Sequence, residues 1–551
     1  MMGGQGDPKA ADRRRALFLR SLRAADRRRG SFLGDLRAAD RRRGSFLESL
    51  RAADRRRELF LKGLGVVRSR CALAIAGLLL GLAATGCSRE AAKEVPVSTE
   101  TTVRETKKEA ETESQKPTDP IPTVIEPFPD AETQAVMEVE PGLKILIATD
   151  IHYLARELTD KGSAFTYMVE HGDGKVTHHI WEIMEAFTQE VIRERPDLLI
   201  VSGDMSLNGE LLSHREFAGY LERIEEAKIP VAVIPGNHDI QNPGASRYQG
   251  EECLPAERTS PEQFYQIYRR FGYDEAISRD RESLSYVYPI SDKVWGLMLD
   301  SCQYEDGQNL VGGMVDMETY DWIEEQLDKA AQAQVMLLPV SHHNLLDESQ
   351  IYEEDCTIEH SERLIELLVG WGAPLYVSGH LHVQHYMNSD PNDGGETGIY
   401  EVVTSSLATP PCQYGVLSFQ EDGQFHYHTQ ILDMDTWSRA SGQTDIQLLG
   451  FSDYRTPFLE HVFYNQAHDQ LEKMPELGLS LWEMDRMSQV YAKANCYYYW
   501  GRAVEIAPLI KESKEYELWS ELAAGSLQAD YLEYILEEAV RDYNDLKWEK
   551  E

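Results

Sequence analysis

Cysteines are few in this sequence, and they are scattered. The chain has seven in 551 residues, at positions 71, 87, 253, 302, 356, 412 and 496, and it contains no CxxC pair. This spacing gives no indication of a zinc ribbon, and the odd number that follows position 87 argues against a disulfide framework. We therefore expect most of these thiols to be isolated and buried.

Basic residues become scarce after residue 86. The first 86 residues contain 20 Lys or Arg and 8 Asp or Glu, whereas the remainder contains 35 basic and 85 acidic residues. A surface this acidic repels polyanions, so a DNA or RNA polymer is not an expected partner. The chain is 42% hydrophobic, and its length suffices for a large core and roughly three domains.

The apolar run 71–84 is too short to span a bilayer comfortably. It follows Arg68 and Arg70, and it ends in Ala84-Thr85-Gly86-Cys87. This arrangement resembles a bacterial lipoprotein signal peptide, although Ala84 stands where leucine is more usual. The resemblance predicts a signal peptide at 66–87, lipidation of Cys87, and anchoring at the extracytoplasmic face of the cell membrane.

Two segments around this run are not expected to belong to a folded domain. Residues 1–65 contain Arg-rich repeats with a period of 14, and no Met lies between Met2 and Met137. We interpret the repeats as the product of a mis-called start, with translation beginning at Val66 or Val67. Residues 88–136 are rich in Glu, Thr, Lys, Ser and Pro and cannot bury enough apolar area to offset ordering entropy, so we expect them to form a disordered linker.

An α/β pattern begins after residue 137, because apolar strand-like runs alternate with amphipathic segments. The predicted strands are 143–149, 197–202, 230–235, 294–300, 335–340 and 374–377. The predicted helices are 178–194, 212–227, 261–271, 317–333 and 360–370. Strands at 400–403, 414–419 and 424–432 are expected to form an antiparallel edge or second sheet, which closes a domain at 137–435. Residues 436–551 then form a helical domain without further strands.

Five short polar sequences follow predicted strands, and they contain the candidate metal ligands and catalytic residues. The strings are Asp150-Ile151-His152, Gly203-Asp204, Gly236-Asn237-His238-Asp239, His342-His343 and Gly379-His380-Leu381-His382. In open α/β sheets the carboxyl ends of strands meet at one crevice, and residues i and i+2 of an extended chain point the same way. We expect Gly203, Gly236 and Gly379 to permit the sharp turns after their strands.

The strings supply more donors than one transition metal can accept. The candidate ligands are two carboxylates, four imidazoles and one amide: Asp150, Asp204, His152, His342, His380, His382 and Asn237. Seven donors fit two divalent ions that share a carboxylate, and their nitrogen and oxygen atoms suit Mn, Fe or Zn. Two such ions leave a net positive charge, which would attract a phosphoryl group.

The ordered strings DxH, GD, GNH(D/E), a strand-end His and GHxH resemble the calcineurin-like metallophosphoesterase superfamily over residues 143–410. The resemblance implies a four-layer α-β-β-α sandwich, here with a C-terminal helical extension. It also implies a first metal site, a second metal site and a catalytic His238 that is not a ligand. The first site is Asp150, His152, Asp204 and His382; the second is Asp204, Asn237, His342 and His380.

The resemblance implies a binuclear metal-dependent phosphoesterase in which a metal-bridged hydroxide attacks phosphorus. The strings Asp150-Ile151-His152-Tyr153-Leu154 and Leu158-Thr159-Asp160, with the helical C-terminal region, resemble a bacterial cyclic-nucleotide phosphodiesterase branch. A small phosphodiester is therefore the expected substrate. The alternatives are a phosphomonoesterase, a nucleotide-sugar pyrophosphatase, or a non-catalytic cell-surface binding protein.

For several residues near these strings we favour a structural role over a catalytic or binding role. His342 is favoured over His343 as the ligand because it follows its strand directly. His171, His178 and His179 are expected in a solvated loop and helix start, and Asn208-Gly209-Glu210 is expected to cap a helix. Asp239 either orients the His238 loop or caps local backbone. Tyr497-Tyr498-Tyr499-Trp500 is expected to be core.

Overall fold

The computed structural model describes residues 142–548, except 305–308, 352, 391–397 and 421–422. The predicted Arg-rich repeats, signal peptide, Cys87 anchor and linker lie outside the described residues. In the described part, all of the cysteines that it includes are free, as expected: Cys253, Cys302, Cys356, Cys412 and Cys496.

Two mixed β-sheets form the centre of the fold. The first has the strand order β15-β14-β13-β1-β2-β3, and the second has the order β11-β12-β10-β9-β8-β7-β6. The first sheet consists of β1 (Lys144–Ala148), β2 (Leu198–Ser202), β3 (Val231–Ile234), β13 (Gln413–Phe419), β14 (Phe425–Ile431) and β15 (Asp545–Trp548). The second consists of β6 (Ser278–Arg279), β7 (Tyr286–Pro289), β8 (Val294–Met298), β9 (Met336–Val340), β10 (Leu375–Ser378), β11 (His385–Asn388) and β12 (Tyr400–Val403). A separate ribbon pairs β4 (Ser246–Gln249) with β5 (Glu252–Pro255).

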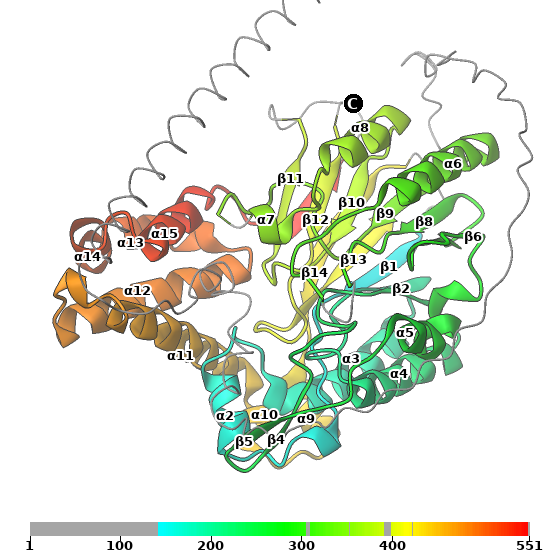
Figure 1. Ribbon diagram of the computed structural model, residues 1–551. Coiled ribbons are helices and arrows are strands. Elements are labelled where there is room, and N and C mark those ends of the chain that lie inside the picture. The colour runs from blue at the N-terminus through cyan, green and yellow to red at the C-terminus, as the bar shows by residue number, and fades with distance from the viewer. Residues whose placement is uncertain (1–141, 305–308, 352, 391–397, 421–422, 549–551) are drawn as a thin grey trace, which may run out of the picture. The chain divides into compact units, whose positions relative to one another are not determined.

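Helices cover the outer face of each sheet, which gives the predicted four-layer α-β-β-α sandwich (Figure 1). The helices packed on the first sheet include α3 (Ile180–Glu194), α4 (Leu211–Glu226) and α5 (Pro261–Tyr268), and those on the second are α6 (Met317–Ala333) and α8 (Glu362–Trp371). The predicted helices are thus confirmed to within a few residues. Two short helices, α2 (Ser163–Glu170) and α7 (Glu353–Cys356), were not predicted.

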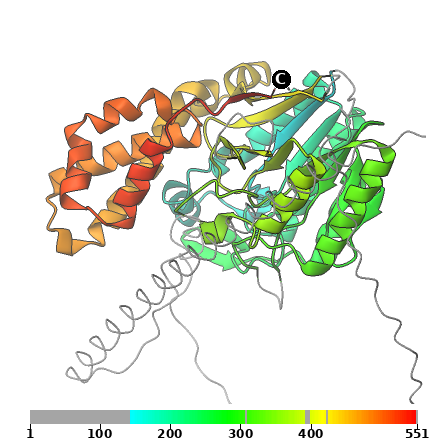
Figure 2. The same ribbon diagram turned by 90° about the horizontal axis from the view of Figure 1, so that it is seen from above.

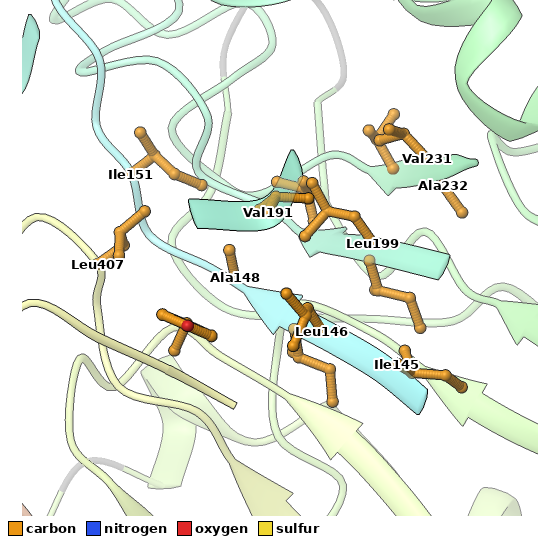
Figure 3. Close-up of a cluster of buried hydrophobic side chains, with 14 of the residues drawn as sticks. Ile145, Leu146, Ala148, Ile151, Val191, Leu199, Val231, Ala232 and Leu407 are labelled. Atoms are coloured by element: carbon orange, nitrogen blue, oxygen red, sulfur yellow. The ribbon is translucent and has the colours of Figure 1, made fainter. Parts of the chain in front are cut away.

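The main core lies around β1, β2 and β3. These strands run parallel, and their residues are almost entirely inaccessible to solvent because both faces of the sheet are covered. Figure 3 shows side chains of this core from the three strands, from α3 and from the loop before β13. The labelled residues are Ile145, Leu146, Ala148, Ile151, Val191, Leu199, Val231, Ala232 and Leu407.

The strands after residue 399 differ from the prediction. β13 and β14 are antiparallel, as expected, but both belong to the first sheet beside β1. β12 does not join β13 and β14. It belongs to the second sheet, where it runs parallel to β10 and antiparallel to β11. Because β11 carries the chain back along the second sheet, β12 starts at the same end as β10.

The C-terminal helices form a bundle that is coloured from amber to red in Figure 2. The bundle and the segment leading to it contain α9 (Met434–Ala440), α10 (Ile446–Leu449), α11 (Phe451–Glu472), α12 (Leu481–Tyr499), α13 (Ala507–Lys511), α14 (Lys514–Leu522) and α15 (Leu527–Glu537). One hydrophobic cluster contains bundle residues together with Leu381, Val383 and Val403 of the second sheet and its loops. Among the described residues, no helix has the length and apolarity required to cross a membrane.

The expectation that this region contains no strand is wrong. β15 pairs antiparallel with β14, and Trp548 stacks on Phe425 with ring centroids 5.6 Å apart. Its four residues alternate polar and apolar, which is too short a pattern to be distinguished from the end of a helix. The strand ties the end of the C-terminal region to the first sheet.

The tyrosine-rich string at 497–500 is half-buried to buried, as the core interpretation predicts.

We predict that the bundle and the sandwich unfold together. Replacing Leu532 by Ala removes a side chain with 0% exposure from the shared cluster and should cost about 2–5 kcal/mol of unfolding free energy. Leu509→Ala, at a position that is 68% exposed, is the matched control and should cost less than about 0.5 kcal/mol. Denaturant unfolding followed by circular dichroism measures both, and equal effects of the two variants would contradict this packing.

Candidate metal centre

The seven predicted ligands converge at the carboxyl ends of strands from both sheets. Asp150 and His152 follow β1, Asp204 follows β2, and Asn237 follows β3. From the second sheet, His342 follows β9, while His380 and His382 follow β10. None of the seven is more than 5% exposed. The facing sheets thus bring together residues that are up to 232 positions apart in the chain.

Four of these residues form a compact group that could hold an ion. Asp150, His152, Asp204 and His382 each offer a ligand atom within 4.8 Å of the others. The Nε2 atoms of His152 and His382 are 2.9 Å apart, and His382 Nε2 lies 3.2 Å from Asp150 Oδ1. These spacings suit donor atoms around a single transition metal.

Asp204 connects this group to a second set of donors. Its Oδ2 atom lies 3.6 Å from His152 Nε2 and 3.5 Å from His342 Nε2. His342 Nε2 is in turn 3.0 Å from Asn237 Oδ1, and the His342 and His380 rings lie 5.0 Å apart. One oxygen atom of Asp204 therefore stands between two sets of donors, which is the place of a carboxylate shared by two ions.

The hydrogen bonds around the imidazoles leave lone pairs directed at the centre. His342 Nδ1 donates to the Ser202 carbonyl at 2.9 Å, so the neutral ring presents an unprotonated Nε2 to the Asn237 oxygen. Two acceptors that face each other at this distance require a cation or a proton between them. Asp150 Oδ1 is also buried without a hydrogen-bond partner. The donor set therefore fits bound divalent cations.

The electrostatics of the centre agree with this fit. Burial raises the pKa of Asp150 and of Asp204, but nearby histidines outweigh it and hold both values well below the usual range. Burial lowers the pKa of His152 to about 3 and that of His380 to about 4, which keeps both rings neutral as metal ligation requires. His342 differs from these two rings: burial acts to lower its pKa, yet Asp204 and Asp150 raise it to about 9. Without an ion this ring is therefore protonated at neutral pH, and a bound cation would take the place of the Nε2 proton.

The backbone of the ligands is strained. Twelve non-glycine residues with positive φ occur in the described part of the chain, and five of them are candidate ligands. The five φ values are 52° for Asp150, 46° for His152, 48° for Asp204, 71° for His380 and 60° for His382. Such strain costs of order 1–3 kcal/mol per residue and is typical of functional sites.

The predicted role of the three glycines, which was to permit sharp turns after the strands, applies to only one of them. Only Gly203 has a positive φ, at 97°. A Cβ at Gly236 would lie 2.2 Å from Asp204 Oδ1, and a Cβ at Gly379 would lie 2.2 Å from Thr149 Oγ1. The turn explanation is therefore wrong for Gly236 and Gly379, which are needed because neighbouring loops approach closely.

His238 lies at the rim of the centre. Its side chain is 15% exposed, its Nε2 is 3.9 Å from Asp204 Oδ2, and its backbone N–H donates to Asp204 Oδ1 at 2.8 Å. Its Nδ1 bonds the Leu207 carbonyl at 2.8 Å and Asn208 Oδ1 at 2.9 Å. Nε2 is therefore the nitrogen available to a substrate.

The prediction that Asn208-Gly209-Glu210 caps a helix is wrong, because α4 has no side-chain cap. The Asn208 side chain instead positions His238.

Asp239 braces the loop that carries His238. Its carboxylate accepts hydrogen bonds from the backbone N–H groups of Met205, Ser206 and Gly236, at 2.9–3.2 Å. It therefore links the loop after β2 with the loop after β3. Both interpretations that the sequence left open apply: the bond from Gly236 caps local backbone, and the bonds from Met205 and Ser206 orient the His238 loop.

Other histidines are occupied elsewhere. His343 Nδ1 lies 2.8 Å from Ser301 Oγ and its Nε2 lies 2.9 Å from the Val311 carbonyl, so neither nitrogen is directed at the donors. His178 and His179 are not solvated as predicted. They pack against Tyr454 and other aromatic side chains of α11, and His179 is only 4% exposed.

Sequence reasoning missed Asp173, whose Oδ2 lies 3.9 Å from His382 Nδ1. This carboxylate is part of the string Gly172-Asp173-Gly174-Lys175, which follows no predicted strand. Two glycines around an acidic residue are a turn signal, but only the packing of the loop brings the residue to the centre.

Two segments of the chain match models of known protein families. Residues 143–384 match the family model described as calcineurin-like phosphoesterase. This segment is a calcineurin-like phosphoesterase domain. The protein is accordingly a hydrolase that acts on phosphoric ester bonds. Residues 433–542 match the model described as the C-terminal domain of cyclic nucleotide phosphodiesterase.

The chain is also similar to solved structures. A dimetal phosphatase from Danio rerio is 13% identical, with 53% of this chain and 97% of that chain covered and a TM-score of 0.38. A purple acid phosphatase from yellow lupin (Lupinus luteus) seeds is 16% identical, with 53% of each chain covered and a TM-score of 0.35. A comparison with curated protein sequences finds no match.

We predict that His382→Ala weakens binding of a divalent ion, because it removes one of the four donors of the compact group. The loss should exceed the roughly 10–100-fold that follows removal of an outer-shell partner. His360→Ala is the control, since that side chain is 85% exposed. Metal analysis after loading with Mn²⁺ and dialysis measures the effect. Full occupancy in His382→Ala would exclude this assignment.

Proposed function

We propose that this protein is a two-metal phosphodiesterase that hydrolyses a small, cyclic-nucleotide-like phosphodiester. The position of Asp204 Oδ2, 3.5–3.6 Å from a donor of each set, supports a shared carboxylate and hence two ions. In this proposal the first ion binds Asp150, His152, Asp204 and His382. The second ion binds Asp204, Asn237, His342 and His380, and both are Mn, Fe or Zn.

The choice of substrate rests on the C-terminal region. Its match to the C-terminal domain of cyclic nucleotide phosphodiesterase covers residues 433–542 and supports a diester over a monoester or a nucleotide-sugar pyrophosphate. The bundle shares a hydrophobic cluster with Leu381, which lies between the candidate ligands His380 and His382. The matched region is therefore in contact with the loop that carries two of the candidate ligands.

The reaction needs an activated water, neutralised phosphoryl oxygens and a protonated leaving group. Divalent ions supply the first two when they are bound. His238 supplies the proton in its imidazolium form: Nδ1–H is held by the Leu207 carbonyl and Asn208 Oδ1, so the second proton, on Nε2, is the one that can be transferred to the leaving oxygen. Burial lowers the pKa of His238 although Asp204 acts to raise it, which makes the imidazolium a stronger acid.

We predict that His238→Ala lowers kcat by about 10²–10⁴-fold on a diester and leaves the bound metal unchanged. Purified protein reconstituted with Mn²⁺ would be assayed on 3′,5′-cyclic and 2′,3′-cyclic nucleotides, a chromogenic diester, a chromogenic monoester and a nucleotide sugar. His360→Ala serves as the control.

The substrate panel separates the alternatives. Preference for the monoester or the nucleotide sugar would replace the diester proposal by the corresponding phosphatase or pyrophosphatase. Absence of turnover with Mn, Fe and Zn would favour the cell-surface binding protein. Turnover that survives chelation would overturn the metal assignment itself.

We also propose that the enzyme is anchored through lipidated Cys87 at the extracytoplasmic face of the membrane, on the strength of the signal-like string that precedes it. Metabolic labelling with a fatty-acid analogue should label the wild type, and Cys87→Ser should abolish the label. A native mature protein that retains the Arg-rich repeats, detected by mass spectrometry, would contradict this proposal.

A further inference from the structure

The loop after α2 places an ion pair behind one of the candidate ligands. Asp173 Oδ2 lies 3.9 Å from His382 Nδ1, while the other ring nitrogen of His382 faces Asp150 Oδ1 at 3.2 Å. Asp173 therefore lies on the side of the ring opposite the centre. Lys175 Nζ lies 2.8 Å from the same carboxylate oxygen, and the lysine side chain is only 5% exposed.

The C-terminal helix α11 holds this loop in place. Figure 1 shows α2, in cyan, beside α11. The Gln466 amide of α11 donates to the Gly172 carbonyl, and the Asn465 amide donates to the Glu170 carbonyl at 3.2 Å. Both backbone acceptors are thus bonded by side chains about 295 residues later in the chain.

Close packing leaves the loop little room to move. Gly174 has a φ of 90°, and a Cβ at this position would lie 2.4 Å from Leu459 Cδ1 of α11. On the other side, Val176 N–H donates to the Ala408 carbonyl at 2.8 Å. The loop is therefore fixed between α11 and the segment that precedes β13.

The chemistry of the pair suits an outer partner of a metal-bound histidine. An imidazole that binds a metal through Nε2 keeps a proton on Nδ1, and a carboxylate beside that N–H favours one ring orientation and raises the basicity of the ring. The 3.9 Å separation between Asp173 Oδ2 and His382 Nδ1 exceeds hydrogen-bond distance, so the attraction between them is electrostatic. The buried ammonium of Lys175, 2.8 Å from Asp173 Oδ2, pairs with the carboxylate and compensates its charge.

We propose that Asp173 is a positioning residue for His382, and that helix α11 completes the metal centre by holding the Gly172–Lys175 loop against it. This inference rests on the proposed role of His382 as a ligand. It gives the C-terminal region an indirect part in metal binding, because α11 fixes the loop that carries the carboxylate beside His382.

The test is metal affinity rather than turnover. Asp173→Asn in the otherwise intact protein should weaken Mn²⁺ binding about 10–100-fold in competition with a fluorescent chelator. It should also change the visible absorption spectrum of the Co²⁺-loaded protein. Asp453→Asn is the matched control, because this exposed residue of α11 undergoes the same change of charge. The control should bind Mn²⁺ as the wild type does.

A double variant separates orientation from charge. Asp173→Asn leaves Lys175 without its partner, and the excess positive charge alone could repel the ion. In Asp173→Asn/Lys175→Met both charges are absent, so positioning predicts that Mn²⁺ affinity stays low. Recovery of wild-type affinity in the double variant would overturn the proposal.

A pair of glycine variants tests the role of α11. Gly174→Ala introduces a contact with Leu459 and should weaken Mn²⁺ binding several-fold. Gly442→Ala has similar backbone strain, at a φ of 72°, but nothing lies within 4 Å of its Cβ, so Mn²⁺ binding should not change.

The outcomes also distinguish this inference from the function on which it rests. Wild-type Mn²⁺ affinity and Co²⁺ spectrum in Asp173→Asn, together with loss of affinity in His382→Ala, would overturn the inference and leave the metal centre standing. Wild-type affinity in both variants would mean that His382 is not a ligand, and the proposed centre would fail with it.

Discussion

Two ionised carboxylates, Asp150 and Asp204, are buried where the two sheets meet. The other groups of the site must compensate these two buried negative charges. A buried charge without a partner is costly, and of the surrounding imidazoles His152 and His380 are neutral while His342 holds a proton. Only positive charge at the centre satisfies both kinds of donor. The fold therefore prepares a space for cations before any substrate is considered.

The region after residue 433 is part of the same structural unit as the sandwich. It contributes a strand to the first sheet, shares a hydrophobic cluster with the loop of His382, and bonds the backbone around Gly172. A chain that folded only as far as β14 would lack all three contacts. The helical bundle therefore supports the loops around the centre and is not an appendage.

The fold and the seven donors were predictable because their signals are local. Each ligand lies within a few residues of a buried strand, and the strand patterns and polar strings are visible without knowledge of packing. Asp173 was not predictable, because its loop is positioned by α11, about 290 residues away.

The other differences have the same origin in packing. The burial of His179 and the closeness of Gly236 to Asp204 depend on contacts between distant segments. The parallel direction of β12 depends on where β11 returns the chain. A pattern of residues along one segment carries none of this information.

The left-handed backbone of five candidate ligands has a consequence for the protein in the cell. Conformations of this kind persist only when other interactions hold them, and an ion that binds only the native state raises its stability by linkage. The protein should then be most vulnerable to proteases when metal is scarce. The supply of transition metals to the cell would then affect the amount of intact protein as well as the activity of each molecule.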